Sequence, residues 1–212
     1  MSSTNKIISI YKSRKTIIEL LEKQEYDTTE YNNFNVNEID AMISTNQLDM
    51  LLSKTDKKTN KSSKIYIKYY LESKQLRSAI LDDIIEDLFT LEATLNKDDT
   101  LVVIIDNEPN ESIISKIEYL YDHDGIFVVI FNIQRLQFNV LNHKLVPPIK
   151  ILDDNEREEF LKKYNINSMA KIPEIGRFDP QAQAVFLRPG DICKFERESF
   201  TALKYDYYRI CI

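Results

Sequence analysis

Two apolar runs in the middle of the chain constrain the fold most. Leu101–Ile105 and Ile126–Phe131 contain only aliphatic and aromatic residues. Such runs are typical of strands buried on both faces, because a strand with one solvated face alternates apolar and polar residues. A third segment, Ile65–Tyr70, is rich in β-branched and aromatic residues and predicts another strand. The sequence therefore predicts a sheet that is covered on both sides.

The segments between these strands have the apolar spacing of helices. One set of apolar positions is Leu76, Ile80, Ile84, Leu88 and Leu91, and the other is Ile113, Ile114, Ile117 and Leu120. Alternating strands and helices predict an α/β sheet region over 65–141, which closes with a short strand or turn at Leu136–Leu141. Asp106 and Glu108 follow a buried strand, and we expect them to cap the next helix.

Two more helices are predicted before the sheet. The segment Ile7–Gln24 carries an apolar stripe that includes Arg14. A stripe arginine usually extends to solvent or finds a carboxylate, and contact with a partner surface is the alternative. The second helix is predicted at Val36–Leu52, with apolar positions at Ile39, Met42, Ile43 and Leu51.

A lysine-rich segment, 53–64, separates these helices from the sheet. It has no aliphatic or aromatic residue and carries five lysines, so we expect a solvated loop that connects its neighbours. The alternative is a loop close to a phosphate backbone. Its candidate DNA-proximal residues are Lys54, Lys57, Lys58, Lys61 and Lys64.

The last third of the chain has a different pattern. Pro147–Pro148 blocks helix and ladder hydrogen bonding, which predicts a domain boundary between 1–147 and 148–212. Asp153 and Asp154 are expected to open a short helix. Pro189–Gly190 has the residues of a type II turn, and the predicted strands are Ile192–Arg197 and Tyr205–Ile212. The expected fold class is α+β with two domains, the second small and β-rich.

Few residues point to catalysis. The first glycine is Gly125, which leaves no glycine-rich phosphate loop, and His123 and His143 lack a nucleophile at motif spacing. Asp106 and Glu108 stand where nuclease carboxylates stand, yet no neighbouring strand offers the acid-any-lysine pairing of a metal site. We expect no catalytic, metal or cofactor-binding residues, and a nuclease-like α/β enzyme is the alternative.

Charge and composition narrow the partners. A net charge of −6 argues against a free-standing nucleic-acid binder, because neutralising phosphates requires a basic surplus. Two distant cysteines form no disulfide framework, and no apolar run approaches the ~20 residues of a membrane span. We expect an intracellular protein with no membrane partner and no small-molecule substrate.

The C-terminal stretch resembles the assembly domain of RNA polymerase subunit five, a domain that stands alone in archaea as a small separate subunit. The likeness rests on Asp179–Ala182, Leu187–Lys194, Arg197–Ala202 and Tyr208–Ile210. Upstream, His143–Pro147 resembles the hinge into that domain, and Ile172–Ile175 its proline-centred segment. Tyr11–Ile17 is similar to the first helix of the eukaryotic N-terminal jaw domain.

The resemblance implies a non-catalytic subunit that docks on the largest polymerase subunit and contacts other subunits. It also implies a jaw, with a restriction-endonuclease-like layout, beside the downstream duplex DNA. The docking residues that it implies are Asp179, Pro180, Arg188, Gly190, Lys194, Arg197, Ser199, Thr201, Tyr208 and Arg209. A free adaptor that uses the same C-terminal module is a further alternative.

The chain departs from the family at several positions. The family often has glycine where Phe186 and Leu203 stand, so we expect two tight backbone positions to be built differently, and Ile149 replaces a usual histidine. The abundance of Asn, Ile and Lys indicates an AT-rich genome and suggests a copy encoded by a large DNA virus. The expected location is the nucleus, or the host cytoplasm and virion if the gene is viral.

Overall fold

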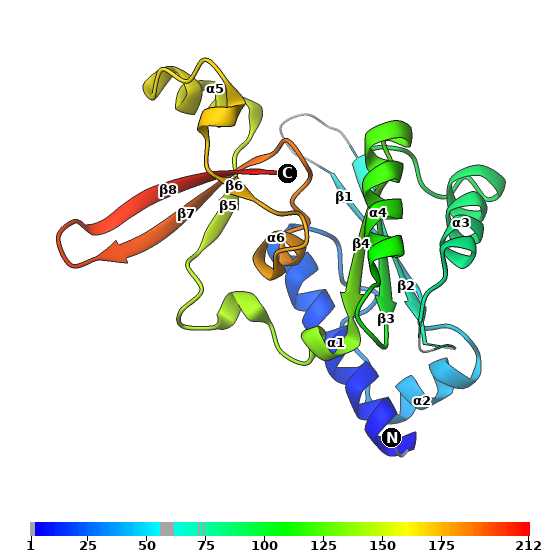
Figure 1. Ribbon diagram of the computed structural model, residues 1–212. Coiled ribbons are helices and arrows are strands. Elements are labelled where there is room, and N and C mark those ends of the chain that lie inside the picture. The colour runs from blue at the N-terminus through cyan, green and yellow to red at the C-terminus, as the bar shows by residue number, and fades with distance from the viewer. Residues whose placement is uncertain (1–2, 56–61, 72, 74) are drawn as a thin grey trace. The chain divides into compact units, whose positions relative to one another are not determined.

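The computed structural model describes residues 3–55, 62–71, 73 and 75–212. The chain divides into two compact units, Met1–Phe138 and Asn139–Ile212 (Figure 1). Each unit contains helices and one four-stranded sheet with both parallel and antiparallel neighbours. The strand orders are β1-β2-β3-β4 in the first unit and β5-β7-β8-β6 in the second. The α+β class expected from the sequence is confirmed.

The sheet of the first unit is parallel except at one edge. Strand β1 (Met50–Thr55) is antiparallel to β2 (Ser62–Tyr70). Strands β2, β3 (Thr100–Ile105) and β4 (Phe127–Asn132) are parallel neighbours. Every residue of β3 and β4 is buried. This confirms the prediction that the two apolar runs form strands covered on both faces.

Helices flank this sheet. They are α1 (Ser3–Lys23), α2 (Val36–Ser44), α3 (Ser78–Glu86) and α4 (Glu111–Tyr119). Helices α3 and α4 connect β2 to β3 and β3 to β4, and each continues into a short π-helical segment, Asp87–Leu91 and Leu120–Asp124. The two helices lie side by side, since Lys116 of α4 forms a 2.8 Å ion pair with Asp82 of α3.

The helix predicted at Val36–Leu52 is confirmed only in its first half. Helix α2 ends at Ser44, and Asn46 with φ +53° follows it. The chain then enters β1, in which Met50 and Leu52 are buried while Leu51 is 38 % exposed. This alternation of buried and exposed side chains has the period of a strand, not of a helix. Leu51 therefore belongs to a strand rather than to the predicted helix Val36–Leu52.

The lysine-rich segment is also not a loop throughout. Ser53–Thr55 of β1 pair with residues 62–64 of β2, in the register Ser53↔Lys64 to Thr55↔Ser62. The hydrogen bonds between strands join backbone groups and require no apolar side chains. The polar composition of these residues therefore predicted a loop where the chain forms strands. Residues 56–61 lie outside the described part of the chain.

The second unit is built around a hairpin. Strand β7 (Ile192–Ser199) pairs with β8 (Leu203–Cys211), and the short strands β5 (Ile149–Ile151) and β6 (Glu174–Ile175) flank them. One face of the hairpin packs on a cluster that includes Ala182 of α6 (Pro180–Ala184). The other face packs on Phe160 of α5 (Asp154–Lys163). The hairpin thus separates two small hydrophobic cores.

Local signals in this unit predicted its elements well. Asp153 caps α5, because its side chain accepts a hydrogen bond from the backbone N–H of Glu156. Of the strand or turn predicted at Leu136–Leu141, the turn is confirmed: one 3₁₀ turn, Ile133–Leu136, ends the first unit's part of this segment and another, Val140–Asn142, begins the second unit's. Each of these turns begins after an asparagine whose side chain accepts a backbone hydrogen bond.

The division between the units lies before the expected boundary. The second unit begins at Asn139, whereas the proline pair predicted a start at Pro148. Leu141 packs against the core of the second unit. Gln181 of α6 also donates a 3.2 Å hydrogen bond to the carbonyl of Pro147. The residues before the prolines therefore contribute contacts to the second unit.

Candidate functional site

Two of the predicted docking residues form the start of α6. Asp179 is the N-cap, and its carboxylate accepts a 2.8 Å hydrogen bond from the backbone N–H of Gln181. Pro180 occupies the first helical position, where its missing N–H costs nothing. Both residues therefore stabilise the local chain path of the second unit.

Arg188 and Gly190 form a turn. The backbone N–H of Asp191 donates to the carbonyl of Arg188 at 3.0 Å, and Gly190 has φ +91°, as the third position of a type II turn requires. The Asp191 carboxylate accepts a 3.0 Å bond from the N–H of Arg188, while burial raises the pKa of that carboxyl. The turn is joined to β8 because Gly190 N–H donates to the carbonyl of Cys211 at 2.9 Å.

The β7–β8 hairpin has one face on which charges compensate one another. Lys194 lies 3.5 Å from Asp206, and Lys204 forms an ion pair with Glu196. On the same face Tyr208 stacks on Phe160 of α5, with ring centroids 4.3 Å apart. We call this the charge-paired face.

The opposite face of the hairpin carries two arginines. We call it the arginine face and define it by Arg197, Leu203, Tyr205, Tyr207 and Arg209, which alternate with the residues of the charge-paired face. The guanidinium carbons of Arg197 and Arg209 lie 4.7 and 5.3 Å from the centroid of the Tyr207 ring. Arg209 also donates a 3.3 Å hydrogen bond to the carbonyl of Glu174.

The arginine face leaves positive charge uncompensated. Across the described ranges, neither Arg197 nor Arg209 forms an ion pair with a carboxylate. The Nε atom of Arg209 is buried without a hydrogen-bond partner. The two hairpin faces therefore differ in electrostatics, although they belong to the same two strands.

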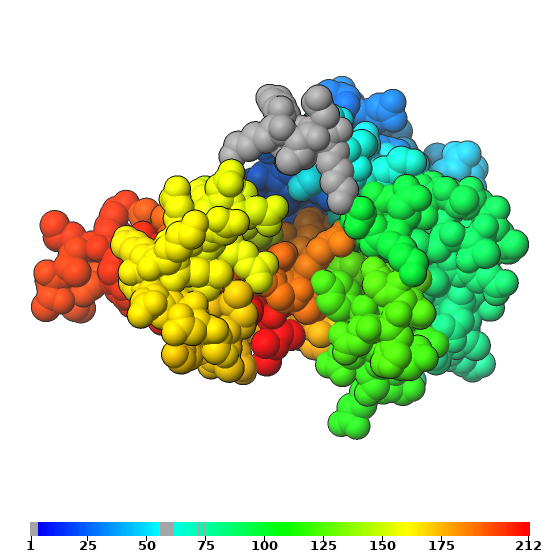
Figure 2. Space-filling view, turned by 90° about the horizontal axis from the view of Figure 1, so that it is seen from above, coloured from blue at the N-terminus to red at the C-terminus, as the bar shows by residue number. Residues whose placement is uncertain are grey.

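The hairpin ends in an apolar tip. Phe200 is fully exposed and Leu203 is 82 % exposed. The predicted residues Ser199 and Thr201 lie at this tip, where their hydroxyl oxygens are 3.2 Å apart and the N–H of Thr201 donates to the hydroxyl of Ser199. Figure 2 shows the hairpin end, in orange-red, standing out beyond the yellow α5 segment of the same unit.

Phe186 and Leu203 adopt left-handed backbone conformations. Their φ angles are +54° and +56°, in the region that glycine occupies most readily. At both positions the chain adopts this strained conformation with a side chain present, where glycine would adopt it without strain.

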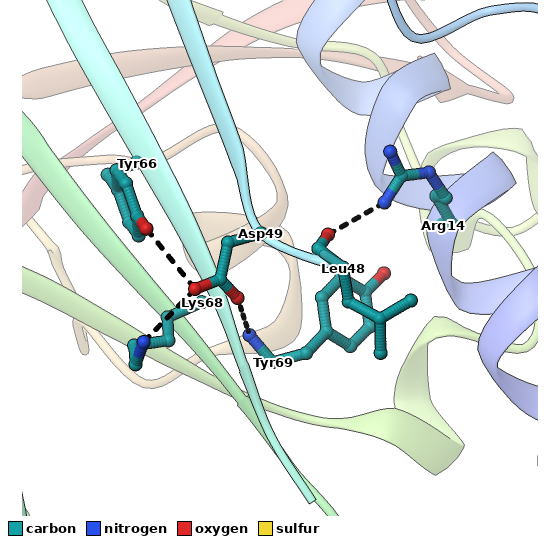
Figure 3. A network of polar contacts seen from close by, with 6 residues as sticks. All are labelled: Arg14, Leu48, Asp49, Tyr66, Lys68 and Tyr69. Carbon is teal, nitrogen blue, oxygen red and sulfur yellow. Dashed lines mark hydrogen bonds and ion pairs between the residues drawn. The ribbon is translucent and has the colours of Figure 1, made fainter. Parts of the chain in front are cut away.

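A second polar cluster lies in the first unit, around Asp49 (Figure 3). One carboxylate oxygen accepts hydrogen bonds from the Tyr66 hydroxyl at 3.2 Å and from Lys68 Nζ at 3.0 Å. The other accepts from the backbone N–H of Tyr69 at 3.0 Å. Burial raises the pKa of Tyr69 to about 12 and also raises that of Tyr66. Asp49 was not predicted as a polar site, because it lies within the predicted helix Val36–Leu52.

Comparison with known proteins identifies the family. The family described as "RNA polymerase Rpb5, C-terminal domain" matches residues 138–211. DNA-directed RNA polymerase subunit Rpo5 of Thermococcus kodakarensis is 42 % identical over 76 residues, which are 36 % of this chain and 92 % of that protein. This chain belongs to the family of the fifth RNA polymerase subunit.

Other relatives match either about a third of the chain or the whole of it. Subunit Rpo5 of Archaeoglobus fulgidus is 36 % identical over 77 residues, or 36 % of this chain and all of that protein. The subunit rpabc1 of DNA-directed RNA polymerases I, II and III from Dictyostelium discoideum is 26 % identical over 212 residues, the whole of both chains. The match to the C-terminal family begins at residue 138, next to the division of the structure at Phe138.

Arg14 does not behave as the sequence analysis expected. Its side chain is 2 % exposed and donates a 2.7 Å hydrogen bond to the carbonyl of Leu48. The guanidinium lies over the rings of Tyr31 and Phe34, 5.7 and 5.4 Å from their centroids. Burial lowers the pKa of Arg14. It therefore does not reach solvent, forms no ion pair with a carboxylate of the described residues, and contributes to the interior of the first unit.

The carboxylates after β3 have a different role from the one expected. Asn110, not Asp106 or Glu108, caps α4, since its side chain accepts a 2.9 Å bond from Ile113 N–H. Glu108 instead accepts a 2.9 Å hydrogen bond from Arg135 Nε. The expectation that Asp106 and Glu108 cap the helix is therefore wrong.

A nuclease site would require a second carboxylate near Asp49. Asp49 and Lys68 supply an acid and a lysine, but Tyr66 stands two residues before Lys68, where an acid-any-lysine motif has its acid. Both Asp49 oxygens already accept hydrogen bonds. In the described part of the chain, no three acidic, histidine or cysteine side chains gather as a metal would require.

Two of the candidate DNA-proximal lysines, Lys54 and Lys64, lie within the described residues, and each contacts the protein itself. Lys54 lies over the ring of Tyr26, with Nζ 4.8 Å from its centroid. Lys64 donates from Nζ to the carbonyl of Thr94 at 3.3 Å. Lys57, Lys58 and Lys61 lie outside the described residues.

Over the same described ranges, no helix has the length and apolarity to cross a bilayer.

Proposed function

We propose that this protein is a non-catalytic subunit of a multisubunit DNA-directed RNA polymerase. In this proposal the second unit docks on the largest polymerase subunit, and the first unit lies beside the downstream duplex DNA as a jaw. The supporting observation is the 42 % identity with archaeal Rpo5, of which the match covers 92 %. A relative that consists almost entirely of this segment supports a docking role for the segment itself.

The electrostatics support DNA contact only within a complex. The net charge is −6, and Lys54, Lys64 and Lys68 all make contacts within the protein. A chain of net negative charge has no basic surplus with which to neutralise phosphates, so the other polymerase subunits would supply the affinity for DNA. Polymerase membership supports an intracellular site of action, in the nucleus or, for a viral gene, in the host cytoplasm and virion.

A pull-down followed by mass spectrometry tests the proposal. The tagged full chain should recover the largest polymerase subunit, together with the other subunits, from an extract of its source cells. Recovery of a single unrelated protein without polymerase subunits would favour the free-adaptor alternative. The isolated chain should bind duplex DNA no more tightly than ~10⁻⁴ M at physiological salt, as expected for weak non-specific binding.

The nuclease alternative has its own test. We expect no cleavage of DNA by the purified chain with Mg²⁺ or Mn²⁺, since Asp49 already holds three donors. Metal-dependent cleavage that disappears in both Asp49→Asn and Asp106→Ala would replace the subunit proposal with the nuclease.

A further inference from the structure

The arginine face of the hairpin differs from every other charged surface of the second unit described above. On the charge-paired face, Lys194 and Lys204 each have a carboxylate partner. On the arginine face, Arg197 and Arg209 contact only the Tyr207 ring and the Glu174 carbonyl. Two cations close to one aromatic ring repel each other, and neither forms an ion pair with a carboxylate of the described residues.

The surface has the chemistry of a protein-binding site. Arginine and tyrosine are among the residue types that contribute most to binding energy at protein interfaces. The Tyr207 ring restricts the motion of both guanidinium groups, so less side-chain entropy is lost when a partner binds. A planar guanidinium with free N–H groups fits a carboxylate with two parallel hydrogen bonds.

An apolar surface continues from the arginines to the end of the hairpin. Tyr205 is 39 % exposed, Leu203 82 % and Phe200 fully exposed. A partner segment that reaches from Arg209 to Phe200 would thus meet positive charge first and apolar side chains next. The complementary segment carries Asp or Glu residues followed by apolar residues.

We infer that the arginine face binds an acidic segment with adjacent apolar side chains, contributed by the largest polymerase subunit. This inference rests on the proposed docking function and assigns it to one face of the hairpin. Carboxylates of that segment pair with Arg197 and Arg209, and its apolar residues cover Leu203 and Phe200. The charge-paired face needs no partner to offset its charges and packs on α5, while the base of the arginine face packs on the cluster that includes Ala182.

Charge-reversal variants on each face of the hairpin test which face binds the largest subunit. The test measures equilibrium binding of the full chain to the purified largest subunit at several salt concentrations. The double variant Arg197→Glu/Arg209→Glu should bind at least ~30-fold more weakly, the loss typical of a reversed charge at an interface contact. Arg197→Lys/Arg209→Lys keeps the charges without the guanidinium geometry and should fall between the wild type and the reversed variant.

The matched control is Lys204→Glu on the charge-paired face of the same hairpin. Its side chain is 67 % exposed, and the change in charge per residue is the same. We expect its affinity to stay within about twofold of the wild type, as for a charge outside the interface. Thermal melts of all variants confirm that the hairpin is folded in each.

Three results would overturn the inference. If Lys204→Glu weakens binding as much as the double reversal, the arginine face is not the docking surface, although the proposed function stands. If the double reversal leaves binding to the largest subunit intact and lowers affinity for duplex DNA, the surface binds nucleic acid instead. If the wild type does not bind the largest subunit at all, both the proposed function and the docking surface are wrong.

Discussion

Arg14 and Arg209 carry the same chemical group in contrasting surroundings. Both have a buried Nε atom without a hydrogen-bond partner, and both donate from Nη1 to a backbone carbonyl while contacting an aromatic ring. Arg14 is almost completely buried, whereas Arg209 lies on the half-exposed face of a hairpin. The neighbours of Arg14 enclose it on several sides, and those of Arg209 leave part of it accessible.

The difference separates structural from binding roles. The contacts of Arg14 come from the segment before α2 and from the residue before Asp49, so it joins α1 to distant parts of the first unit. The contacts of Arg209 come from its own strand and from the neighbouring β6. A cation of the first kind should matter to folding, and one of the second kind to docking.

The largest expected effect comes from Arg14→Ala. It removes two ring contacts, opens a cavity and leaves the Leu48 carbonyl without its donor, so the free energy of unfolding should fall by about 3 kcal/mol. Urea denaturation followed by circular dichroism measures this loss. Arg209→Ala is the matched control and should cost less than ~1 kcal/mol, because part of the side chain is already in solvent. Equal losses would contradict the contrast between the two sites.

The next effect concerns the turn that joins the second unit to its last strand. Gly190→Val should lower the free energy of unfolding by about 2 kcal/mol, since a β-branched side chain is strained at φ +91°. A Cβ atom at Gly190 would meet no other atom within 4 Å beyond its chain neighbours, so the loss would come from the backbone alone. Gly176→Ala is the control, because Gly176 has no positive φ and equal space. A Gly190→Val variant with unchanged melting temperature would show that the turn tolerates side chains.

The surroundings of Arg14 should also respond to alkaline pH. Burial raises the pKa of Tyr69 from 10.0 to about 12, so the folded state favours the neutral phenol. This stability is fully present below pH ~10 and is lost as the pH rises toward 12, because the unfolded chain releases the proton first. Per pH unit the loss is about 1.4 kcal/mol.

Tyr69→Phe tests this pH dependence. Between pH 10 and 12 the free energy of unfolding of the variant should fall less steeply with pH than that of the wild type. The difference between the two slopes should be at most the contribution of one ionising group. Near pH 7 the variant should be slightly less stable, because Tyr69 lies 3.3 Å from the Ser13 hydroxyl and that hydrogen bond is lost. Parallel alkaline curves for the two proteins would show that Tyr69 ionises freely in the folded state.

The smallest effect is a gain in stability at the tip of the hairpin. Leu203→Gly removes the strain of a side chain at φ +56° and loses little packing, since Leu203 is 82 % exposed. Glycine also raises the conformational entropy of the unfolded chain, which offsets part of this effect. We therefore expect the free energy of unfolding, measured by thermal unfolding, to rise by about 0.5–1 kcal/mol. Phe186→Gly has the same backbone geometry but removes a buried ring, and it should be destabilising. A destabilised Leu203→Gly would mean that the exposed leucine packs on the protein.

Short-range patterns in the sequence determined much of the fold. The apolar runs of β3 and β4, the Asp153 cap and the Pro189–Gly190 turn were all predicted, because the residue pattern that indicates each of them lies within a few positions. The resemblance to the family also rests on contiguous segments, most of them from Asp179 onward. Such features can be recognised before any distant contact is known.

Tertiary structure alone decided the candidate sites. Arg14 and the Leu48 carbonyl are 34 positions apart, and Asp49 meets Lys68 across two segments, one of which the sequence analysis took for a helix. The two faces of the hairpin depend on the pairing of Phe195 with Tyr207, because a shift of one residue would exchange the faces. Side-chain type specifies which contacts are favourable, but only the register and packing of distant segments determine which of them form.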